Sequence, residues 1–485
     1  MPSMRKKIRK ILTTIFILFV VASFAIVTVI VIIIAQGGKV TPDGIEKTGI
    51  IKLNVQPDKN LKVYVDDKLV SINDSKIENL NTGIHNLRIE KENYTNWTKD
   101  VEVEEGIVSE IWAFLFPIEL KLKQMTSTGI ERAFYSPDGS YVVYIVKNSN
   151  SNNNGIWKLK LTQSTFGLVE NKPEKISSLN SKLTETLNSE YSVSISPNNE
   201  RFLLQTDKEQ LIYTMNGSDV PINLIEVTNL GLMADKLTWF RQGDSLIAEK
   251  NKSIYEYNIS DNTTQFIYSF PNSPLYTVNG RTLIFNTDHK YYSYSNKEKT
   301  LLDISKTVTL PEPSNIWLSH NSDEILYVKS DEQLYYVNTK KTILPIGEFD
   351  IVEISPNGTA AIIEDNQNKL YVFRSEYIAP KDSFTTSIKL INETFSSENT
   401  SYIWSSDSLQ IIENQKTSAG IEGGNTSSNV ITIIDKYGEN KHVILKTAHI
   451  INNDCYLANN SRDFVVLLRD SNNKGNNLYM INLID

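Results

Sequence analysis

The hydrophobic pattern of the chain changes once, early on, and the change separates two kinds of segment. Residues 11–35 form an apolar run without a charged side chain. From about residue 49 onward, apolar and polar residues alternate in short stretches separated by Gly, Pro, Asn, Asp and Ser. Such alternation is the pattern of β-strands joined by turns. The sequence therefore predicts one long apolar helix followed by an all-β remainder.

The apolar run is long enough to cross a membrane. As a helix, 11–35 would span roughly 37 Å, against a hydrocarbon core of roughly 30 Å. The first ten residues contain five basic side chains and no acidic one: Arg5, Lys6, Lys7, Arg9 and Lys10. The positive-inside rule then places the tail 1–10 in the cytoplasm and the bulk of the chain outside. We expect a single-pass anchor in the cell membrane, followed by a linker over 36–48.

A cleaved signal peptide is the alternative reading of the same run. Its apolar region would measure about 7 to 15 residues and end in a small-x-small cleavage site. The run here is longer, and the "IIIAQGG" that closes it is a poor site of that kind. The pattern favours the anchor.

Period-two alternation begins at about residue 49. "GIIKLNVQP" and "LKVYVDDKLV" predict two strands joined by a turn at 57–60, and "GIHNLRIEKENY" and "TKDVEVEEG" predict more strands. The stretch 49–122 resembles the PEGA module, a small β-domain of bacterial and archaeal surface proteins, in its Pro-centred turn, "VYVD" strand, "GIH" turn and "NY" corner. Asp67 and Asn93 stand where that family has glycine, and Asn tolerates a positive φ. The resemblance implies a β-fold and an envelope location, and it brings no catalytic residue.

From 124 to 485 the chain repeats a turn-strand-turn-strand unit. The turn is clearest in "SPDGSYVVYIV" and "SPNGTAAIIED" and partial in "SPNNERFLLQTD". Pro fixes φ at the second turn position, Asp or Asn suits the third, and Gly accepts a positive φ at the fourth. Eight copies begin at Ser136, Ser196, Arg241, Asn279, His320, Ser355, Ser405 and Asn459.

One such unit cannot bury both faces of its strands, whereas a closed ring of units can. The repeats resemble the WD40-like or PD40 hairpins of TolB-type propellers, in which "SPDG" opens the inner hairpin of a blade. We predict a seven- or eight-bladed β-propeller over 124–485, with eight favoured by the count of copies. Ring closure is expected to need a strand from near Lys121 in the final blade. Two stacked β-sandwiches are the alternative, which the regular repetition disfavours.

Motifs for catalysis or metal binding are missing from the sequence. It has no Gly-x-Ser-x-Gly elbow, no His-Glu-x-x-His and no phosphate-binding Gly-rich loop after a strand. Cys455 is the single cysteine, which excludes an internal disulfide and suggests a buried small hydrophobe. We expect no enzyme, no cofactor and no catalytic or metal residue, and the sequence identifies no ligand-binding residue. None of the five histidines has metal or hydrolase spacing: His85, His289, His320, His442 and His449.

Several smaller features have competing interpretations. His85 lies at a turn, so a turn-stabilising role is favoured over metal binding. Trp112, Phe114 and Phe116 form either a sugar- or membrane-touching patch or, as we expect, a buried joint between domains. "DSNNKGNN" at 470–477 is read as a polar hairpin tip in preference to a calcium loop, and "NSNSNNNG" at 148–155 as a flexible loop. Glycosylation is left open at the N-x-Ser/Thr triplets, among them Asn73, Asn93, Asn96, Asn258 and Asn392.

Charge narrows the class of partner. Removing the five basic residues of the tail from the net charge of −8 leaves −13 for the rest of the chain, which disfavours nucleic acid. The leading hypothesis is a membrane-anchored, extracytoplasmic binding or scaffold protein of the cell envelope, whose propeller face binds a protein or a surface glycan. The alternative is an envelope polysaccharide hydrolase or lyase using channel carboxylates, which acidic residues with raised pKa clustered at one opening would favour. A purely structural spacer is the third hypothesis.

Overall fold

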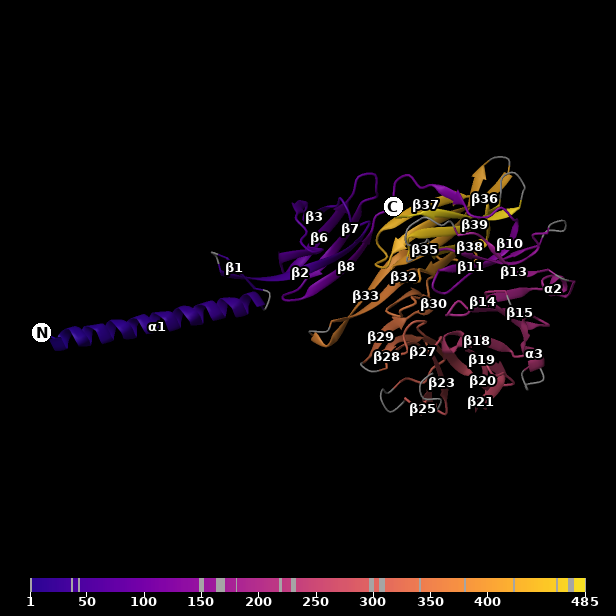
Figure 1. Ribbon diagram of the computed structural model, residues 1–485, viewed down its shortest axis with the longest axis horizontal. Coiled ribbons are helices and arrows are strands. Elements are labelled where there is room, and N and C mark those ends of the chain that lie inside the picture. The colour runs from indigo at the N-terminus through magenta and orange to yellow at the C-terminus, as the bar shows by residue number, and fades with distance from the viewer. Residues whose placement is uncertain are drawn as a thin grey trace. The chain divides into compact units, whose positions relative to one another are not determined.

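The chain consists of two compact units, one ending at Glu119 and the other beginning at Leu120. The structure is a computed structural model, and it describes residues 2–35, 38–41, 44–147, 152–162, 171–179, 181–217, 220–227, 233–295, 301–304, 310–339, 342–378, 381–421, 424–458, 461–469 and 475–484. Figure 1 shows these residues coloured along the chain.

The apolar run forms helix α1 (Pro2–Ala35), which extends beyond the expected span into the basic tail. From Thr13 to Val31 the helix is long and apolar enough to cross a membrane, a property that a signal sequence at this position would share. The hydroxyl of Ser23 donates to the carbonyl oxygen of Phe19 at 2.9 Å. The hydroxyl of Thr28 donates in the same way to the carbonyl oxygen of Phe24, four residues before it, at 2.8 Å. Neither hydroxyl would therefore be left unpaired in a lipid environment.

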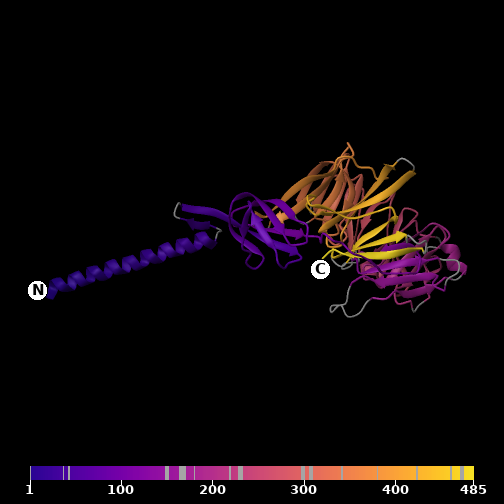
Figure 2. The same cartoon turned by 90° about the horizontal axis from the view of Figure 1, so that it is seen from above.

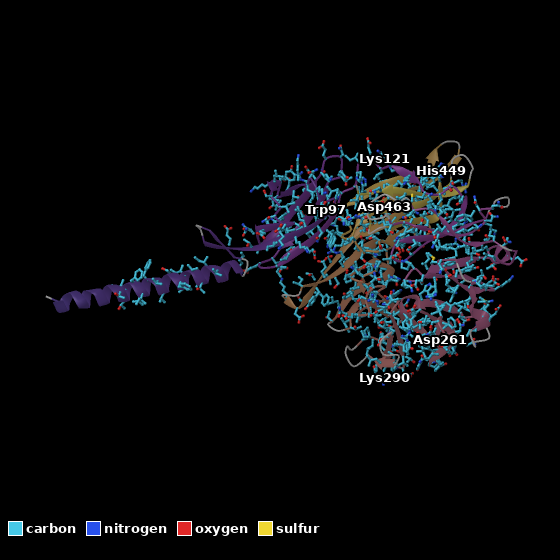
Figure 3. All side chains as sticks on the ribbon, viewed as in Figure 1. Trp97, Lys121, Asp261, Lys290, His449 and Asp463 are labelled. Atoms are coloured by element: carbon cyan, nitrogen blue, oxygen red, sulfur yellow. The ribbon has the colours of Figure 1, made fainter. Side chains whose placement is uncertain are left out.

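The β-strands of the first unit form two four-stranded sheets. One has the order β1 (Gly38–Thr41), β2 (Gly44–Gln56) and β5 (Lys76–Asn81), with β8 (Val108–Phe114) parallel to β2. The other has the order β4 (Lys68–Val70), β3 (Lys62–Val65), β6 (Gly83–Glu90) and β7 (Trp97–Val103). Inward-facing residues of both sheets form the core, and Trp97 is 1% exposed within it (Figure 3).

The segment "LKVYVDDKLV" contains a hairpin, where the sequence predicted a single strand. Val65 pairs with Lys68, and the two residues between them have φ values of 50° at Asp66 and 61° at Asp67. A two-residue hairpin loop needs a positive φ at both positions, which Asp tolerates better than most residues. Asn93 also has a positive φ, 62°. The two residues that replace family glycines thus keep the backbone conformation that glycine would supply.

The second unit consists of four-stranded antiparallel sheets, eight of them among the described residues (Figures 1 and 2). The first four sheets are β10 (Ile130–Tyr135), β11 (Tyr141–Val146), β12 (Gly155–Lys160), β13 (Glu174–Ser178); β14 (Tyr191–Ile195), β15 (Arg201–Thr206), β16 (Gln210–Thr214), β17 (Ile222–Asn223); β18 (Lys236–Phe240), β19 (Ser245–Lys250), β20 (Ser253–Asn258), β21 (Thr263–Ser269); and β22 (Leu275–Val278), β23 (Thr282–Thr287), β24 (Lys290–Ser295), β25 (Leu301–Asp303).

The remaining four sheets follow the same order. They are β26 (Asn315–Leu318), β27 (Ile325–Ser330), β28 (Gln333–Asn338), β29 (Thr342–Glu348); β30 (Asp350–Ile354), β31 (Ala360–Glu364), β32 (Leu370–Ile378), β33 (Ser383–Asn392); β34 (Thr400–Trp404), β35 (Gln410–Ile421), β36 (Gly424–Asp435), β37 (Lys441–Thr447); and β38 (Ile450–Ala458), β39 (Asp463–Arg469), β40 (Asn476–Asn482), β9 (Leu122–Gln124). Three short helices lie in connections: α2 (Ser181–Thr186), α3 (Leu224–Val227) and the 3₁₀ turn η1 (Arg241–Gly243).

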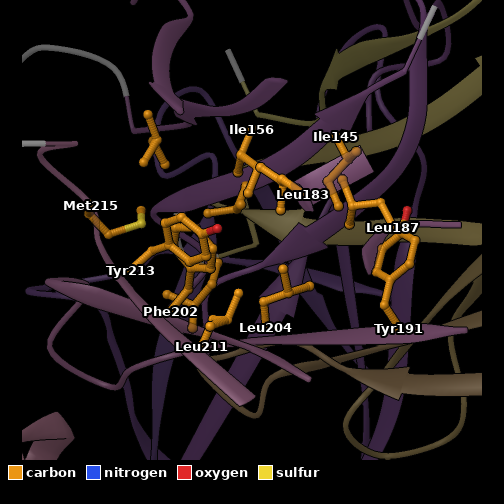
Figure 4. Packing of buried hydrophobic residues seen from close by; sticks show 13 residues of the cluster. Ile145, Ile156, Leu183, Leu187, Tyr191, Phe202, Leu204, Leu211, Tyr213 and Met215 are labelled. Atoms are coloured by element: carbon orange, nitrogen blue, oxygen red, sulfur yellow. The ribbon is translucent and has the colours of Figure 1, made fainter. Parts of the chain in front are cut away.

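Each repeat of the sequence builds one sheet, and the sheets share their buried faces with their neighbours as propeller blades do. In β11, Val143 and Ile145 pack with the second sheet, while Val142, Tyr144 and Val146 pack with the eighth. Figure 4 shows the first of these clusters, with Phe202, Leu204, Leu211 and Tyr213 from the second sheet. Similar clusters join the second sheet through to the seventh. The propeller expected from the repeats is the observed fold, and the number of blades in its ring stays a prediction.

A strand from the start of the unit completes the last sheet. β9 pairs with β40 through Gln124 and Tyr479, Lys123 and Met480, and Leu122 and Ile481. The expected contribution of a strand from near Lys121 to the final blade is thereby confirmed. The closure joins the two ends of the unit, because β9 lies in the last sheet and the chain continues from it into β10 of the first sheet.

We predict that Thr126→Val weakens this closure. The buried Thr126 hydroxyl accepts the backbone N–H of Leu478 at 3.0 Å, and valine would leave that N–H without its acceptor. The free energy of unfolding should fall by about 1–3 kcal/mol, the cost of an unsatisfied buried donor. Urea unfolding of the full chain in detergent, followed by circular dichroism, measures the change. The matched variant Thr386→Val, at an exposed position in β33, should stay within about 0.5 kcal/mol, and equal losses in the two variants would contradict the prediction.

Candidate functional site

The topology separates the propeller into two rims of different character. First strands of neighbouring sheets contact one another, as β10 does with β14 and β22 does with β26, so they are the innermost strands. We call the end that carries the connection from the first to the second strand the turn rim. The opposite end, which carries the connections that follow the second and fourth strands, is the loop rim. Tyr135, paired with Val142, lies at the turn rim, and Ile130, paired with Val146, lies at the loop rim.

The repeated turn at the turn rim is held by a buried serine. The Ser136 hydroxyl donates to Asp138 Oδ1 at 2.7 Å and accepts the backbone N–H of Tyr141 at 2.9 Å. The backbone carbonyl oxygen of Ser136 also accepts a hydrogen bond from the N–H of Gly139 at 2.9 Å. Gly139 has φ 70°, and a Cβ there would lie 3.0–3.3 Å from Tyr456, Leu457 and Ala458. The third position of "SPDG" thus needs a side chain that bonds the Ser136 hydroxyl. The fourth position needs glycine because a Cβ there would crowd the neighbouring strand.

Three other turns repeat this arrangement. The serine donates to the side chain two residues later in the pairs Ser196–Asn198, Ser355–Asn357 and Ser405–Asp407, at 2.7, 2.9 and 2.6 Å. The fifth turn begins one residue earlier than the sequence suggested, because Ser319, not His320, is the fully buried residue whose N–H bonds across the turn to Ile325. Asn459, the expected start of the eighth turn, lies outside the described residues.

The third turn replaces the buried serine with an ion pair. Arg241 contacts the carboxylate of Glu256, which is 5% exposed and also accepts hydrogen bonds from the hydroxyls of Ser245 and Tyr294 at 2.8 and 2.7 Å. These four groups come from the third sheet and, through Tyr294, from the fourth. Burial alone would raise the pKa of Glu256, but the hydrogen bonds from Arg241 and Tyr294 outweigh it and lower that pKa. Glu256 is therefore a charged structural group.

Neighbouring turns are hydrogen-bonded to one another around the whole turn rim. The donor and acceptor atoms, in order around the rim, are Asn199 Nδ2 to Asp138 Oδ2 (2.7 Å), Asn198 N to Gln242 O (3.1 Å), Gln242 N to Gly280 O (2.8 Å), Asn279 Nδ2 to Ser319 O (2.9 Å), Ser319 Oγ to Pro356 O (2.9 Å), Asn357 N to Ser408 Oγ (3.0 Å), Ser461 Oγ to Asp407 Oδ1 (2.9 Å) and Tyr456 Oη to Pro137 O (3.2 Å). The polar groups of the repeated motif thus form hydrogen bonds that connect neighbouring sheets of the propeller.

The carboxylates of the turns therefore fit a structural role better than acid or base catalysis. Asp138 accepts hydrogen bonds from Ser136, Ser140 and Asn199. Burial would raise the pKa of Asp138, but these bonds outweigh it and lower the pKa. Asp407 is similarly surrounded by the hydroxyls of Ser405 and Ser461. A general acid would need the opposite shift.

Two described carboxyls do have a raised pKa, and they lie apart. Burial raises the pKa of Glu353, on the inner strand β30, to about 7. Burial and the charges of Asp350 and Asp365 raise the pKa of Glu364. Glu353 pairs with Ile362 near the turn rim, whereas Glu364 pairs with Asp350 at the loop rim. These two carboxyls thus do not form the cluster at one opening that would favour the hydrolase or lyase hypothesis.

Connections at the loop rim are unequal, in contrast to the turns. The connection after the second strand has two residues between β19 and β20 and eight between β11 and β12. The connection after the fourth strand is a single residue between β29 and β30, and elsewhere it holds the helices α2 and α3. Loops that vary while their scaffold stays constant are where propellers and other rigid folds place binding residues. The loop rim is therefore the better candidate for recognition.

Cation and aromatic pairs lie where inner strands begin, at the loop rim. The guanidinium of Arg132 lies 5.1 Å from the ring centroid of Tyr191 and donates to the Tyr191 carbonyl oxygen at 2.8 Å. The exposed Lys236 places its Nζ 5.0 Å from the ring of Tyr276, whose hydroxyl donates to Glu249 at 2.9 Å. Tyr191 is buried in the core, whereas Lys236 is exposed, so Lys236 is the member of these pairs that this rim offers to a partner. Sequence analysis missed these pairs because their members are 40 to 60 residues apart.

His85 stabilises a turn, as its position in the sequence suggested. Its Nδ1 lies 2.7 Å from Asp66 Oδ2 and its Nε2 lies 2.8 Å from the carbonyl oxygen of Asn81. Both neighbours are acceptors, so both ring nitrogens can donate only when the imidazole is protonated. Burial alone would lower the pKa of His85, but the hydrogen bonds to Asp66 and Asn81 outweigh it and raise the pKa. The ring thereby ties the β3–β4 turn to the end of β5.

The remaining histidines and the cysteine do not gather into a site. Across the described residues, no group of three or more His, Cys, Asp or Glu side chains could hold a metal ion. His289 contacts Glu312 at 2.9 Å and is exposed, as is His449 (Figure 3). Cys455 is 3% exposed, which confirms its expected burial.

The aromatic residues before Pro117 are mainly buried. Phe114 and Phe116 are 4% and 5% exposed, and the backbone of Phe116 bonds to Thr95 in both directions. These two rings therefore do not form an exposed aromatic patch, and a role as a joint between the units stays a prediction. The segments 148–151 and 470–474, to which the sequence assigned a flexible loop and a hairpin tip, lie outside the described residues.

A comparison with known protein families identifies the small β-domain of the first unit. Residues 50–115 match the family model described as the PEGA domain, which confirms the resemblance seen over 49–122. No curated protein matches the sequence significantly.

Similar solved structures include two WD40 domains and one enzyme. The WD40 domain of SCAP from fission yeast is 11% identical, with 75% of this chain and 94% of that chain covered and a TM-score of 0.41. The C-terminal WD40 domain of Sif2 is 10% identical, with 75% and 98% covered and a TM-score of 0.43. An oligogalacturonate lyase from Vibrio parahaemolyticus is 8% identical, with 74% and 98% covered and a TM-score of 0.38.

We predict that His85 makes the stability of the first unit depend on pH. A pKa that is raised in the folded state stabilises the fold below the unfolded value, about 6.5 for His. That contribution is lost as the pH rises through the higher folded value. Unfolding measured between pH 5 and pH 9 should show the decline in the wild-type chain, and His85→Gln should remove it. The control His289→Gln, at an exposed position, should keep the wild-type profile, and a His85→Gln profile that also stays unchanged would contradict the role.

Proposed function

We propose that the protein is a membrane-anchored binding or scaffold protein of the cell envelope, which holds its propeller outside the membrane and binds a protein or a surface glycan at the loop rim. The observation that supports this most strongly is the contrast between the rims. The turn rim uses its repeated polar groups to bond turn to turn, whereas the loop rim combines unequal loops with aromatic and basic side chains.

The orientation follows from the ends of helix α1. The basic residues precede the apolar span, so the tail stays on the cytoplasmic side and both β-units lie outside. The PEGA match over residues 50–115 supports an envelope location, because the module is found in surface proteins. The remaining chain carries a net charge of −13, which makes nucleic acid an unsuitable partner.

The pKa shifts and hydrogen bonds of the buried carboxylates favour binding over catalysis. Asp138 has a lowered pKa and is fully engaged in hydrogen bonds, and Glu256 is held as a structural anion. Glu353, with a pKa of about 7, favours the hydrolase or lyase alternative, and Glu364, the other described carboxyl with a raised pKa, lies at the opposite rim. Glycosidic cleavage pairs such an acid with an ionised carboxylate, and the turn carboxylates Asp138 and Asp407 are instead bonded to the hydroxyls of neighbouring serines.

The test is retention of cell-envelope material by the full chain in detergent micelles. Protein and glycan components that are retained are identified separately, and retained glycan is checked for shortening. We expect an intact partner and a loss of binding of about tenfold in Lys236→Glu, which reverses an exposed charge at the loop rim. The control Arg281→Glu reverses an exposed charge at the turn rim and should bind like the wild type.

Two results would overturn the proposal. A shortened glycan would show that the protein is an enzyme, and the same reaction should then fail in Glu353→Gln. Equal loss of binding in Lys236→Glu and Arg281→Glu would show that the loop rim is not the recognition surface.

A further inference from the structure

β33 is the longest outer strand that the structure describes in the propeller, with ten residues against seven in β21, β29 and β37. An outer strand leaves one row of backbone N–H and C=O groups unpaired, and proteins normally protect such an edge by shortness, charge or proline. β17 and β25 have two and three residues, β29 contains Pro345, and β13 begins with Glu174 and Lys175. β33 has ten residues, "SFTTSIKLIN", with Lys389 as its one charged side chain.

The edge of β33 is open, and its pairing with β32 is regular from Ser383 to Leu390, beyond which a register shift leaves Ile391 unpaired in the ladder. Among the described residues its only partner strand is β32, with which it pairs from Ser383 to Asn392. Six successive residues, from Thr385 to Leu390, are exposed. The strand is rich in Thr, Ile and Phe, which favour extended backbone. It therefore offers a long template for one more strand.

One face of β33 carries apolar side chains into solvent. Ile388 and Leu390 are 44% and 36% exposed, and they pair with Phe373 and Tyr371 on β32. Directly opposed residues share a face, so these side chains point toward the fifth sheet, against which Phe373 and Tyr371 pack. Phe349 extends the same surface, with its ring centroid 5.6 Å from that of Tyr371. On the other face, Lys389 contacts Glu439 of the seventh sheet.

Carboxylates border this apolar surface at the loop-rim end of β33. Asp365 accepts a hydrogen bond from the hydroxyl of Tyr371 at 3.0 Å. The pKa of Tyr371 is raised mainly by burial and by this hydrogen bond. The negative charges of Asp365 and Glu393 raise it further, so both acids lie near the ring. Glu348 and Asp350 flank Phe349 and are exposed, although Lys329 pairs with Asp350. The apolar surface thus ends in an excess of negative charge.

We propose that β33 is a docking edge for an extended segment of another protein, which adds a fifth strand to the sixth sheet. Its alternate side chains are apolar and lie against Ile388, Leu390 and Phe349. Its Lys or Arg residues lie at the end beside Asn392, where they meet Asp365, Glu348 and Glu393. Backbone hydrogen bonds along the edge supply affinity, and the apolar and acidic positions supply specificity. This surface is separate from the loop-rim site and does not depend on it.

The test uses fluorescent peptides and the full chain in detergent micelles. The probe Lys-Lys-Val-Thr-Ile-Thr-Val-Thr alternates apolar and polar residues behind a basic end. One comparison peptide has Glu in place of both Lys, and another has Pro in place of Ile. Fluorescence anisotropy should show saturable binding of the probe, and binding at least tenfold weaker for each comparison peptide.

Variants of the chain locate the binding. Ile388→Lys should weaken probe binding about tenfold, whereas the control Val443→Lys, at a position 43% exposed on the outer strand β37, should leave it unchanged. Lys236→Glu should also leave it unchanged, which separates this proposal from the loop-rim site.

Three outcomes would overturn the proposal. The probe and its comparison peptides could bind equally, or Ile388→Lys and Val443→Lys could have equal effects. The chain could also form dimers, seen by light scattering, that Ile388→Lys abolishes while no peptide binds. In that case the occupant of the edge is a second copy of the chain.

Discussion

The fold of the larger unit depends on a buried serine hydroxyl that recurs in four of its turns, at Ser136, Ser196, Ser355 and Ser405. It bonds the carboxylate or amide two residues later and the backbone five residues later, and so fixes the reversal between the two innermost strands. Because each turn is fixed, its side chains can reach the next turn, as Asn199 reaches Asp138 and Ser461 reaches Asp407. Contacts between neighbouring turns thereby connect the sheets at the turn rim, and the pairing of β9 with β40 joins the two ends of the unit at an outer strand.

Because the turns are bonded to one another, the two rims of the propeller have different roles. The polar groups of the turn rim are bonded to one another, whereas the loop rim carries unequal connections and exposed groups such as Lys236, which lies over the ring of Tyr276. The outer strands are the third place where the sequence varies without disturbing the ring, and β33 is the longest of those that the structure describes. Recognition at the loop rim and docking at β33 are both proposals about surfaces that the ring leaves unconstrained.

Much of this architecture is predictable from the sequence, because its causes are local. The positions of Ser136 and Ser355, the apolar run and the strand near Lys121 follow from turn chemistry, length and the need to close a ring. The fifth turn was misplaced by one residue because "SHNSDE" lacks the proline that marks the serine position, and burial identifies Ser319. The loop-rim pairs and the surface beside Ile388 join residues from different sheets or depend on strand length, which a repeat pattern does not encode.

The most direct test of the central claim is a double-mutant cycle across one turn-to-turn contact. The Ser461 hydroxyl lies 2.9 Å from each carboxylate oxygen of Asp407 and donates its one hydrogen to that carboxylate, and the two residues come from the eighth and seventh turns. Unfolding free energies of Asp407→Ala, Ser461→Ala and the double variant give the coupling between the turns. The account predicts a coupling of about 1 kcal/mol or more, as expected for a hydrogen bond to a charged group. Effects that add to within about 0.3 kcal/mol would show that neighbouring turns are independent, and would contradict the account.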